Sequence, residues 1–265
     1  MPLFDTIEEF QNVSPVLQWA IFIVACLILL VAIVSVGISI WLSIRYIIYN
    51  RRMNSRNLSG KDAARMILDK NGLQHIKVST MGSMLFGNSY SHYFKKVRLR
   101  RLTTKKTSIT SLAMGAEKSA LAILDKEGDP DMKVRVALTP WMYFGPFAFI
   151  PILAIGVVID LLLFNFSGVA TIIAAVLGLG IYVISFILSI KTLKTEIKAQ
   201  ARACEILKQE DMATDEEIAM MKELFKLYNI QYINDIILEF LQMLLKVLEI
   251  IAKIQGKSSS SGSGD

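Results

Sequence analysis

The stretch that decides the fold is Ser108–Leu124, which reads SITSLAMGAEKSALAIL. Ala, Leu and Met dominate it and no Pro interrupts it, so the composition favours a helix. Ser108 or Thr110 can cap its first turn. Its apolar positions are nearly continuous, which predicts burial on most sides. Glu117 and Lys118 are then the only charged residues at the centre of a buried helix.

The whole chain is more apolar than an ordinary soluble domain. Its 265 residues are 53% hydrophobic, the mean hydropathy is +0.47, and the net charge is +6. Cys26 lies in an apolar run and Cys204 in a charged helix, so no disulfide framework is indicated. His75 and His92 are the only His residues. A metal site with two or three His ligands must therefore use both of them or does not exist.

The first apolar run predicts a transmembrane helix over 16–49, because Arg45 is its only formal charge up to Ile48. Residues 1–15 carry acidic and no basic side chains, so they are not a secretory signal peptide. Basic residues follow the run, which places its end in the cytoplasm and a short N-terminus outside. We expect a multi-pass protein of the cell membrane, with the lipid bilayer as a partner.

A second apolar region predicts a transmembrane hairpin over 141–190, with both ends facing the cytoplasm. Asp160 lies inside it, near the outer end. An acid within the membrane is by default a functional hypothesis, but one near the interface costs little. The favoured interpretation is that Asp160 reaches the headgroups.

Between these regions, residues 50–139 form a basic cytoplasmic domain. Ser59 followed by Asp62 predicts the start of a short amphipathic helix, and Asn71-Gly72 predicts its end. Residues 125–135 are polar and are predicted to form a loop. Three strands of a small sheet are expected over 75–80, 83–86 and 96–100.

Basic residues gather in the middle of this domain. The favoured interpretation is a membrane-surface basic patch beside anionic lipid. Nucleic-acid binding is disfavoured, because stacking aromatics are few and no recognised motif occurs. The patch consists of Lys95, Lys96, Arg98, Arg100, Arg101, Lys105 and Lys106.

The C-terminal part is charged and helical. Cytoplasmic helices are expected over 191–231, one of them opened by a capping box of Thr214 and Glu217. Residues 232–254 predict an amphipathic or fourth membrane helix, and 255–265 a disordered Ser/Gly tail. The polar residues of that helix share one face: Asp235, Glu239, Gln242, Lys246, Glu249 and Lys253.

The order of these elements resembles the YugP-type membrane peptidases, the neutral zinc metallopeptidase family of bacteria. The resemblance implies a mainly α-helical multi-pass membrane protein. Its zincin-like cytoplasmic domain would hold a small β-sheet and a buried metal-site helix. The matching stretches are collinear and cover 58–73, 91–93 with 97–99, 108–123, 135–140, 196–203 and the helix after Thr214.

The family's His-Glu-x-x-His motif falls on the buried helix and is degenerate here. In the family the two His residues bind zinc and the Glu acts as general base. A gap-free register places Glu117 at the first His, Lys118 at the Glu and Leu121 at the second His. A shift of one residue places Glu117 at the Glu, with Ala116 and Ala120 at the His positions. Both imidazole ligands are missing in either register.

The resemblance also implies a third, acidic zinc ligand, and Glu196 matches that position. We therefore predict no catalytic residue and no bound metal. Instead, Lys118 or Lys194 is expected to form a buried ion pair with Glu196 or Glu117, filling the space that the metal left.

Three functions stay open at this point. The first is a pseudopeptidase, which is not an enzyme, needs no cofactor, and binds a membrane or peptide partner. The second is an active zinc metallopeptidase with non-standard ligands, such as His75 and His92; this is disfavoured because the i, i+4 pair is missing. The third is a membrane scaffold subunit that binds a protein partner or a second copy through 232–254.

Overall fold

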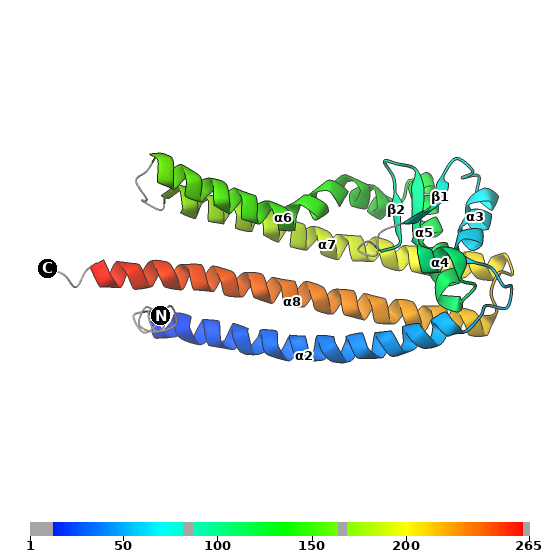
Figure 1. The fold of residues 1–265 in the computed structure, drawn as a ribbon, viewed down its shortest axis with the longest axis horizontal. Helices are drawn as coiled ribbons and strands as arrows, with labels where there is room; N and C mark the ends of the chain where they lie inside the picture. The colour runs from blue at the N-terminus through cyan, green and yellow to red at the C-terminus, as the bar shows by residue number, and fades with distance from the viewer. Residues whose placement is uncertain (1–12, 82–86, 164–168, 262–265) are drawn as a thin grey trace. The chain divides into compact units, whose positions relative to one another are not determined.

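A computed structural model describes residues 13–81, 87–163 and 169–261 (Figure 1). Over these described residues the chain is mostly helical and holds one small three-stranded sheet. The elements are α2 (Pro15–Arg51), α3 (Gly60–Lys70), β1 (Lys77–Met81), β2 (Ser89–Ser91), β3 (Lys96–Arg100), α4 (Arg101–Lys105), α5 (Ile109–Glu127), α6 (Pro130–Leu163), α7 (Val169–Gln209) and α8 (Asp215–Ser261).

The chain divides into two compact units, one of which holds residues 1–41 and 230–265. In this unit the start of α2 packs against the end of α8, where Leu17 and Ala252 share a small apolar cluster. Near the other end, Ser39 Oγ donates a hydrogen bond of 3.1 Å to Gln231 Oε1. The first half of α2 and the second half of α8 therefore run antiparallel.

Helix α8 is longer than the sequence predicts. We expected one helix after Thr214, a separate one over 232–254 and a disordered tail from residue 255. The structure has a single helix through Ser261. The physical reason is that no Gly or Pro occurs between Thr214 and Gln255 to end the helix. Its expected capping box is confirmed: Glu217 N donates to Thr214 Oγ1, and Thr214 N donates to Glu217 Oε2.

The second unit, residues 42–229, contains the sheet. Its strand order is β1-β3-β2, with β1 parallel and β2 antiparallel to β3. The strand predicted over 96–100 is confirmed, and its Val97 and Leu99 are fully buried. The strand predicted over 75–80 lies slightly later, at 77–81, and the one predicted over 83–86 lies outside the described residues. Strand β2 and helix α4 were not predicted, because neither is long enough to show a period.

Helix α5 lies at the centre of this unit's core, as its composition predicts. Almost every residue from Ile109 to Leu124 is buried. Ser108 is the cap, since its Oγ accepts a hydrogen bond of 3.2 Å from Ser111 N, and Gly128 ends the helix with a φ of +72°. Helix α3 packs beside α5, and its predicted Ser59 cap is also confirmed.

The contact between α3 and α5 depends on two glycines. A Cβ added at Gly115 would overlap the carbonyl oxygen of Gly60. We expect Gly115→Ala to lower the free energy of unfolding by about 1–3 kcal/mol, because a rigid backbone faces the new methyl group. Denaturant titration in detergent, followed by circular dichroism, measures this change.

Gly180→Ala is the matched control, since Gly180 is also helical and no atom lies within 4 Å of its added Cβ. Alanine is a better helix former than glycine, so this variant should be unchanged or more stable by up to about 1 kcal/mol. Equal losses in the two variants would contradict the close packing of α3 on α5.

The prediction of a polar loop over 125–135 is wrong. Helix α5 continues to Glu127 and α6 already begins at Pro130. A proline fits the first turn of a helix, and Asp129 Oδ1 caps that turn by accepting a hydrogen bond of 3.0 Å from Met132 N. Only a short turn therefore separates the central helix from α6.

Helices α6 and α7 lie side by side (Figure 1). Gly156 lets them approach closely, since a Cβ there would overlap the side chain of Ala174. By length and composition, α2 and α7 could each cross a membrane, and 151–163 of α6 forms a shorter apolar helix. As predicted, α7 continues without a break into its polar C-terminal part, which returns to α5.

Candidate functional site

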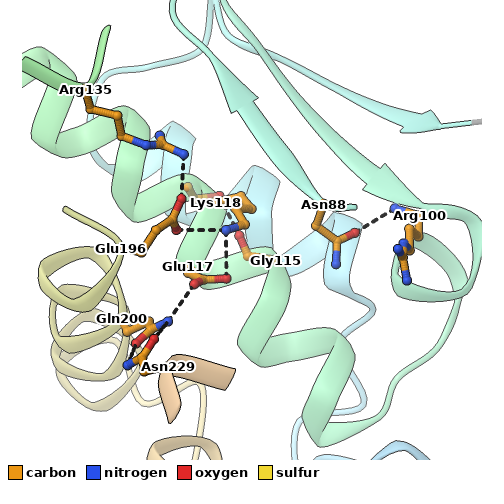
Figure 2. Close-up of polar contacts among 10 residues, drawn as sticks. Asn88, Arg100, Gly115, Glu117, Lys118, Arg135, Glu196, Gln200 and Asn229 are labelled. Carbon is orange, nitrogen blue, oxygen red and sulfur yellow. Dashed lines mark hydrogen bonds and ion pairs between the residues drawn. The ribbon is translucent and has the colours of Figure 1, made fainter. Parts of the chain in front are cut away.

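The two charges of α5 meet α6 and α7 in a buried cluster of ion pairs (Figure 2). Lys118 Nζ lies 3.1 Å from Glu117 Oε2 and 3.0 Å from Glu196 Oε2. The guanidinium of Arg135, from the start of α6, binds the other oxygen of Glu196. The exposed fraction of the Lys118 side chain is only 11%. The predicted ion pair is thus present, and Lys118 joins both carboxylates at once.

Amide side chains extend the cluster towards α8. Gln200 Nε2 donates a hydrogen bond of 3.0 Å to Glu117 Oε1. Gln200 and Asn229 then exchange hydrogen bonds of 3.1 and 2.7 Å. Neither amide was predicted as a site residue. Gln200 could have been found, because it lies four residues after Glu196 and so shares its helix face.

Lys194, the other candidate for this pairing, lies elsewhere. Its ammonium is 3.1 Å from Asp131 Oδ1, and the exposed fraction of its side chain is 68%. The choice of Lys118 over Lys194 follows from burial, because Lys118 sits on a helix that is covered on most sides.

The cluster fixes the protonation of its members. Burial alone would lower the pKa of Lys118, but the carboxylates of Glu117 and Glu196 outweigh it and raise that pKa. Burial would likewise raise the pKa of Glu196, but Lys118 and Arg135 hold it below its ordinary value. For Glu117 burial prevails over Lys118, so its pKa is raised. Lys118 therefore stays charged at neutral pH.

In the gap-free register, the degenerate motif includes the residue of α5 that contacts α7. Glu117 is the α5 residue whose carboxylate reaches Gln200 on α7. Leu121 follows one turn later on the same helix face. Ala116 and Ala120 are rotated by about 100° from that face and are also fully buried. Glu117 and Leu121 therefore share one face of α5, and the Glu117 carboxylate of that face contacts α7.

The sequence model of the family described as "Putative neutral zinc metallopeptidase" matches residues 24–252. The chain belongs to this family. The match runs from α2 into α8 and includes the whole ion-pair cluster. No curated protein and no solved structure matches the chain.

The family implies zinc, and the donors around Lys118 do not fit it. A catalytic zinc takes three protein ligands that donate N, S or O. Here Leu121 offers only hydrocarbon, and the two carboxylates already bind cations. A dication between them would lie against the Lys118 ammonium. Throughout 13–81, 87–163 and 169–261, no group of three or more His, Cys, Asp and Glu side chains is placed to hold a metal.

His75 and His92 line one small cavity of about 180 Å³. His92 Nδ1 lies 2.7 Å from Asp125 Oδ2, and Tyr90 Oη donates a hydrogen bond of 2.6 Å to the same oxygen. Asp125 was not predicted as a partner. Tyr90 lies on β2, but His92 begins the turn before β3, so strand alternation alone did not predict that both side chains contact Asp125.

The basic patch is only partly gathered. Lys95 pairs with Asp125 at 3.5 Å. Lys96, Arg98 and Arg100 point away from the core face of β3, because Val97 and Leu99 occupy that face. The remaining members, Arg101, Lys105 and Lys106, lie on or beside α4.

Asp160 has a structural role that the sequence did not show. It is buried, and its carboxylate accepts hydrogen bonds of 3.0 Å from Ala170 N and 2.6 Å from Thr171 N. It therefore caps the first turn of α7 from the end of α6. We expected Asp160 to reach the lipid headgroups. The structure shows instead that it caps α7 within the hairpin.

We expect Asp160→Ala to lower the free energy of unfolding by about 0.5–2 kcal/mol, the usual cost of losing a helix cap. Asp160→Asn keeps one acceptor oxygen but turns an NH2 donor towards the other backbone N–H, so it should lose about half as much stability as Asp160→Ala. Thermal unfolding in detergent separates the two variants. An Asp160→Ala variant as stable as the wild type would contradict the capping role.

Proposed function

We propose that this member of the neutral zinc metallopeptidase family is a membrane-anchored pseudopeptidase, which works by binding and not by hydrolysis. The observation that carries the proposal is the position of Lys118. Its ammonium lies between Glu117 and Glu196, where the gap-free register would place the metal. The Lys118 ammonium, which is part of the chain, thus takes the place of an exchangeable zinc ion.

Helix α5 lacks two of the groups that zinc-dependent hydrolysis requires, a metal ligand and a general base. Water activation needs a metal that lowers the pKa of the bound water, and a base that takes its proton. Leu121 cannot ligate a metal. Lys118 stays protonated beside two carboxylates and has no lone pair with which to accept a proton. Both losses fall on the same helix, so repairing one of them would not restore activity.

The membrane placement belongs to the same proposal. Helices α2 and α7 are long and apolar enough to span a bilayer. In the proposed topology, α2 crosses first, with the N-terminus outside, and α6 and α7 form a hairpin. Arg45, Arg51 and Arg52 flank the inner end of α2, and Lys191 and Lys194 that of α7. The sheet, α3 and α5 then lie in the cytoplasm.

A scaffold role is the second candidate, and the surface of α8 favours it. Along residues 230–252 the side chains of Asp235, Gln242, Lys246 and Glu249 are exposed. Such a stripe of mixed charge suits another helix with the opposite pattern, including that of a second copy. A lysine-reactive cross-linker should then yield dimers through Lys246, and Lys246→Arg should lose them while keeping the charge.

The experiment that tests the pseudopeptidase proposal is metal analysis of the full chain. The protein is purified in detergent after growth with zinc and without chelator. We expect less than about a tenth of an equivalent of zinc, because a working protein site would retain the metal tightly. One equivalent that is lost on Glu196→Ala would overturn the proposal and indicate a ligand set that includes Glu196.

A further inference from the structure

A groove of about 900 Å³ lies between the sheet and the start of α6. Residues of β1 and β2, the turn before β3, and β3 itself form one wall, and Met132, Arg135, Val136 and Thr139 form the other. None of the described residues that line this groove is Asp or Glu. Its polar side chains carry hydroxyl groups, one amide (Asn88), the His92 imidazole and cations, so the groove suits an anion.

Two cations point into this groove from the middle strand. Lys96 and Arg98 alternate with the buried Val97 and so share the outer face of β3. Within the described part of the chain, neither forms an ion pair with a carboxylate; Arg98 instead lies over the Phe94 ring, 5.3 Å from its centroid. The neighbouring sequence supplies no carboxylate that could compete with a bound anion for these two cations, since no Asp or Glu occurs between Asp69 and Glu117.

Hydroxyl donors lie opposite these cations on the edge strand. Ser89 is the register partner of Arg98, and Ser91 is the register partner of Lys96. Both serines line the groove. A guanidinium, an ammonium and hydroxyl groups on one face are the donors that bind phosphate oxygens.

The groove lies beside the predicted membrane entry of α6. Tyr93 Oη donates a hydrogen bond of 3.1 Å to Val136 O, which ties the turn before β3 to this helix. The predicted span begins at residue 141, so Val136 lies about 7–8 Å below it along the helix axis. At the rim of the groove, Phe94 is 71% exposed. An exposed aromatic ring next to cations is typical of a membrane interface.

We propose that this groove binds the phosphate of an anionic phospholipid, with Lys96 and Arg98 as the phosphate contacts and the acyl chains in the bilayer beside α6. The inference rests on the membrane placement proposed above, and it does not depend on the loss of the zinc site. A lipid is favoured over a free phosphate ion because the groove lies so close to the apolar part of α6.

The test uses the full chain in a non-ionic detergent. Dihexanoyl phosphatidylglycerol, dihexanoyl phosphatidylcholine and inorganic phosphate are titrated separately, and thermal stabilisation reports binding. We expect phosphatidylglycerol to bind at least about tenfold more tightly than either of the others. Lys96→Ala with Arg98→Ala should weaken phosphatidylglycerol binding about thirtyfold, as expected for two basic residues near an anionic headgroup.

Arg101→Ala with Lys105→Ala is the matched control, because these exposed residues do not line the groove. It should change the affinity less than about twofold. Equal losses in the two double variants would overturn the proposal in favour of diffuse attraction to the whole basic patch. Inorganic phosphate binding as tightly as phosphatidylglycerol would overturn the choice of a lipid.

The membrane placement is tested separately by carbonate extraction of the chain from vesicles. A chain that stays in the vesicles but shows no preference for phosphatidylglycerol contradicts only the groove proposal. A chain released by carbonate contradicts the membrane placement itself. Zinc content is unaffected by either result.

Discussion

Lys118→Met is expected to lower the free energy of unfolding by about 3–5 kcal/mol, because it breaks a buried ion pair from one side. Met is unbranched like the Lys stem and is shorter by the terminal ammonium, so the variant chiefly removes the charge. Glu196 would still be bound by Arg135. Glu117 would lose its cation and keep the Gln200 amide as a neutral partner. Denaturant titration in detergent, followed by circular dichroism, measures the loss.

Lys194→Met is the matched control, since the same side chain is replaced at an exposed ion pair on α7. Exposed pairs are screened by water, so the loss should stay below about 1 kcal/mol. A double variant, Lys118→Met with Glu117→Gln, also removes the orphaned charge and should recover most of the lost stability. Equal losses in Lys118→Met and Lys194→Met would contradict the role of the cluster.

The defect of Lys118→Met should depend on pH. Burial raises the pKa of Glu117, and removing the Lys118 cation raises it further. A carboxyl group whose pKa is raised on folding stabilises the folded state below its unfolded pKa. This stabilisation is lost as the pH rises through the folded pKa. The defect should therefore be smaller at about pH 5 than at about pH 8, and the double variant should show little difference between them.

The sequence predicts the parts of this fold that depend on local sequence patterns. The caps of Ser59, Ser108 and Thr214 and the alternation of β3 are local patterns, and the structure confirms them. The errors occur where local composition is ambiguous. Polar residues on either side of Asp129 indicated a loop, but a left-handed glycine and a proline allowed one helix to end and the next to begin within a few residues.

The candidate site was predictable to the extent that it depends on chain order. The resemblance to the family predicted a buried ion pair of Lys118 or Lys194 with Glu196 or Glu117, and the structure contains the pair of Lys118 with both carboxylates. The roles of Arg135 and Asn229 were not accessible, because they depend on how α6 and α8 approach α5. Helix packing depends on many side chains from several helices at once, so no periodic pattern in a single sequence predicts it.

A chain with the motif restored is expected to gain zinc. Glu117→His, Lys118→Glu and Leu121→His together should bind about one equivalent, against less than about a tenth in the wild type. The two imidazoles would lie at i and i+4 on the face towards α7. Removing Lys118 frees Glu196 Oε2 to act as third ligand, while Arg135 keeps the other oxygen. Adding Glu196→Ala to the triple variant should remove the metal again.

The shifted register supplies the matched control for this gain. Ala116→His with Ala120→His keeps Glu117 and also creates a His pair at i and i+4, but it turns both imidazoles about 100° away from α7. This variant should bind no more zinc than the wild type. If it binds one equivalent and the triple variant binds none, the gap-free register is wrong. If neither binds, the helix frame does not hold a zincin site.

Zinc binding confined to the gap-free register would also help to explain why the degenerate site is stable without a metal. In a metal site the dication balances the carboxylates that bind it, so losing the metal alone would leave buried negative charge. Here Lys118 and Arg135 provide two positive charges against the two carboxylates of Glu117 and Glu196. The charge balance of the site is kept without a metal, which is what the proposed pseudopeptidase requires.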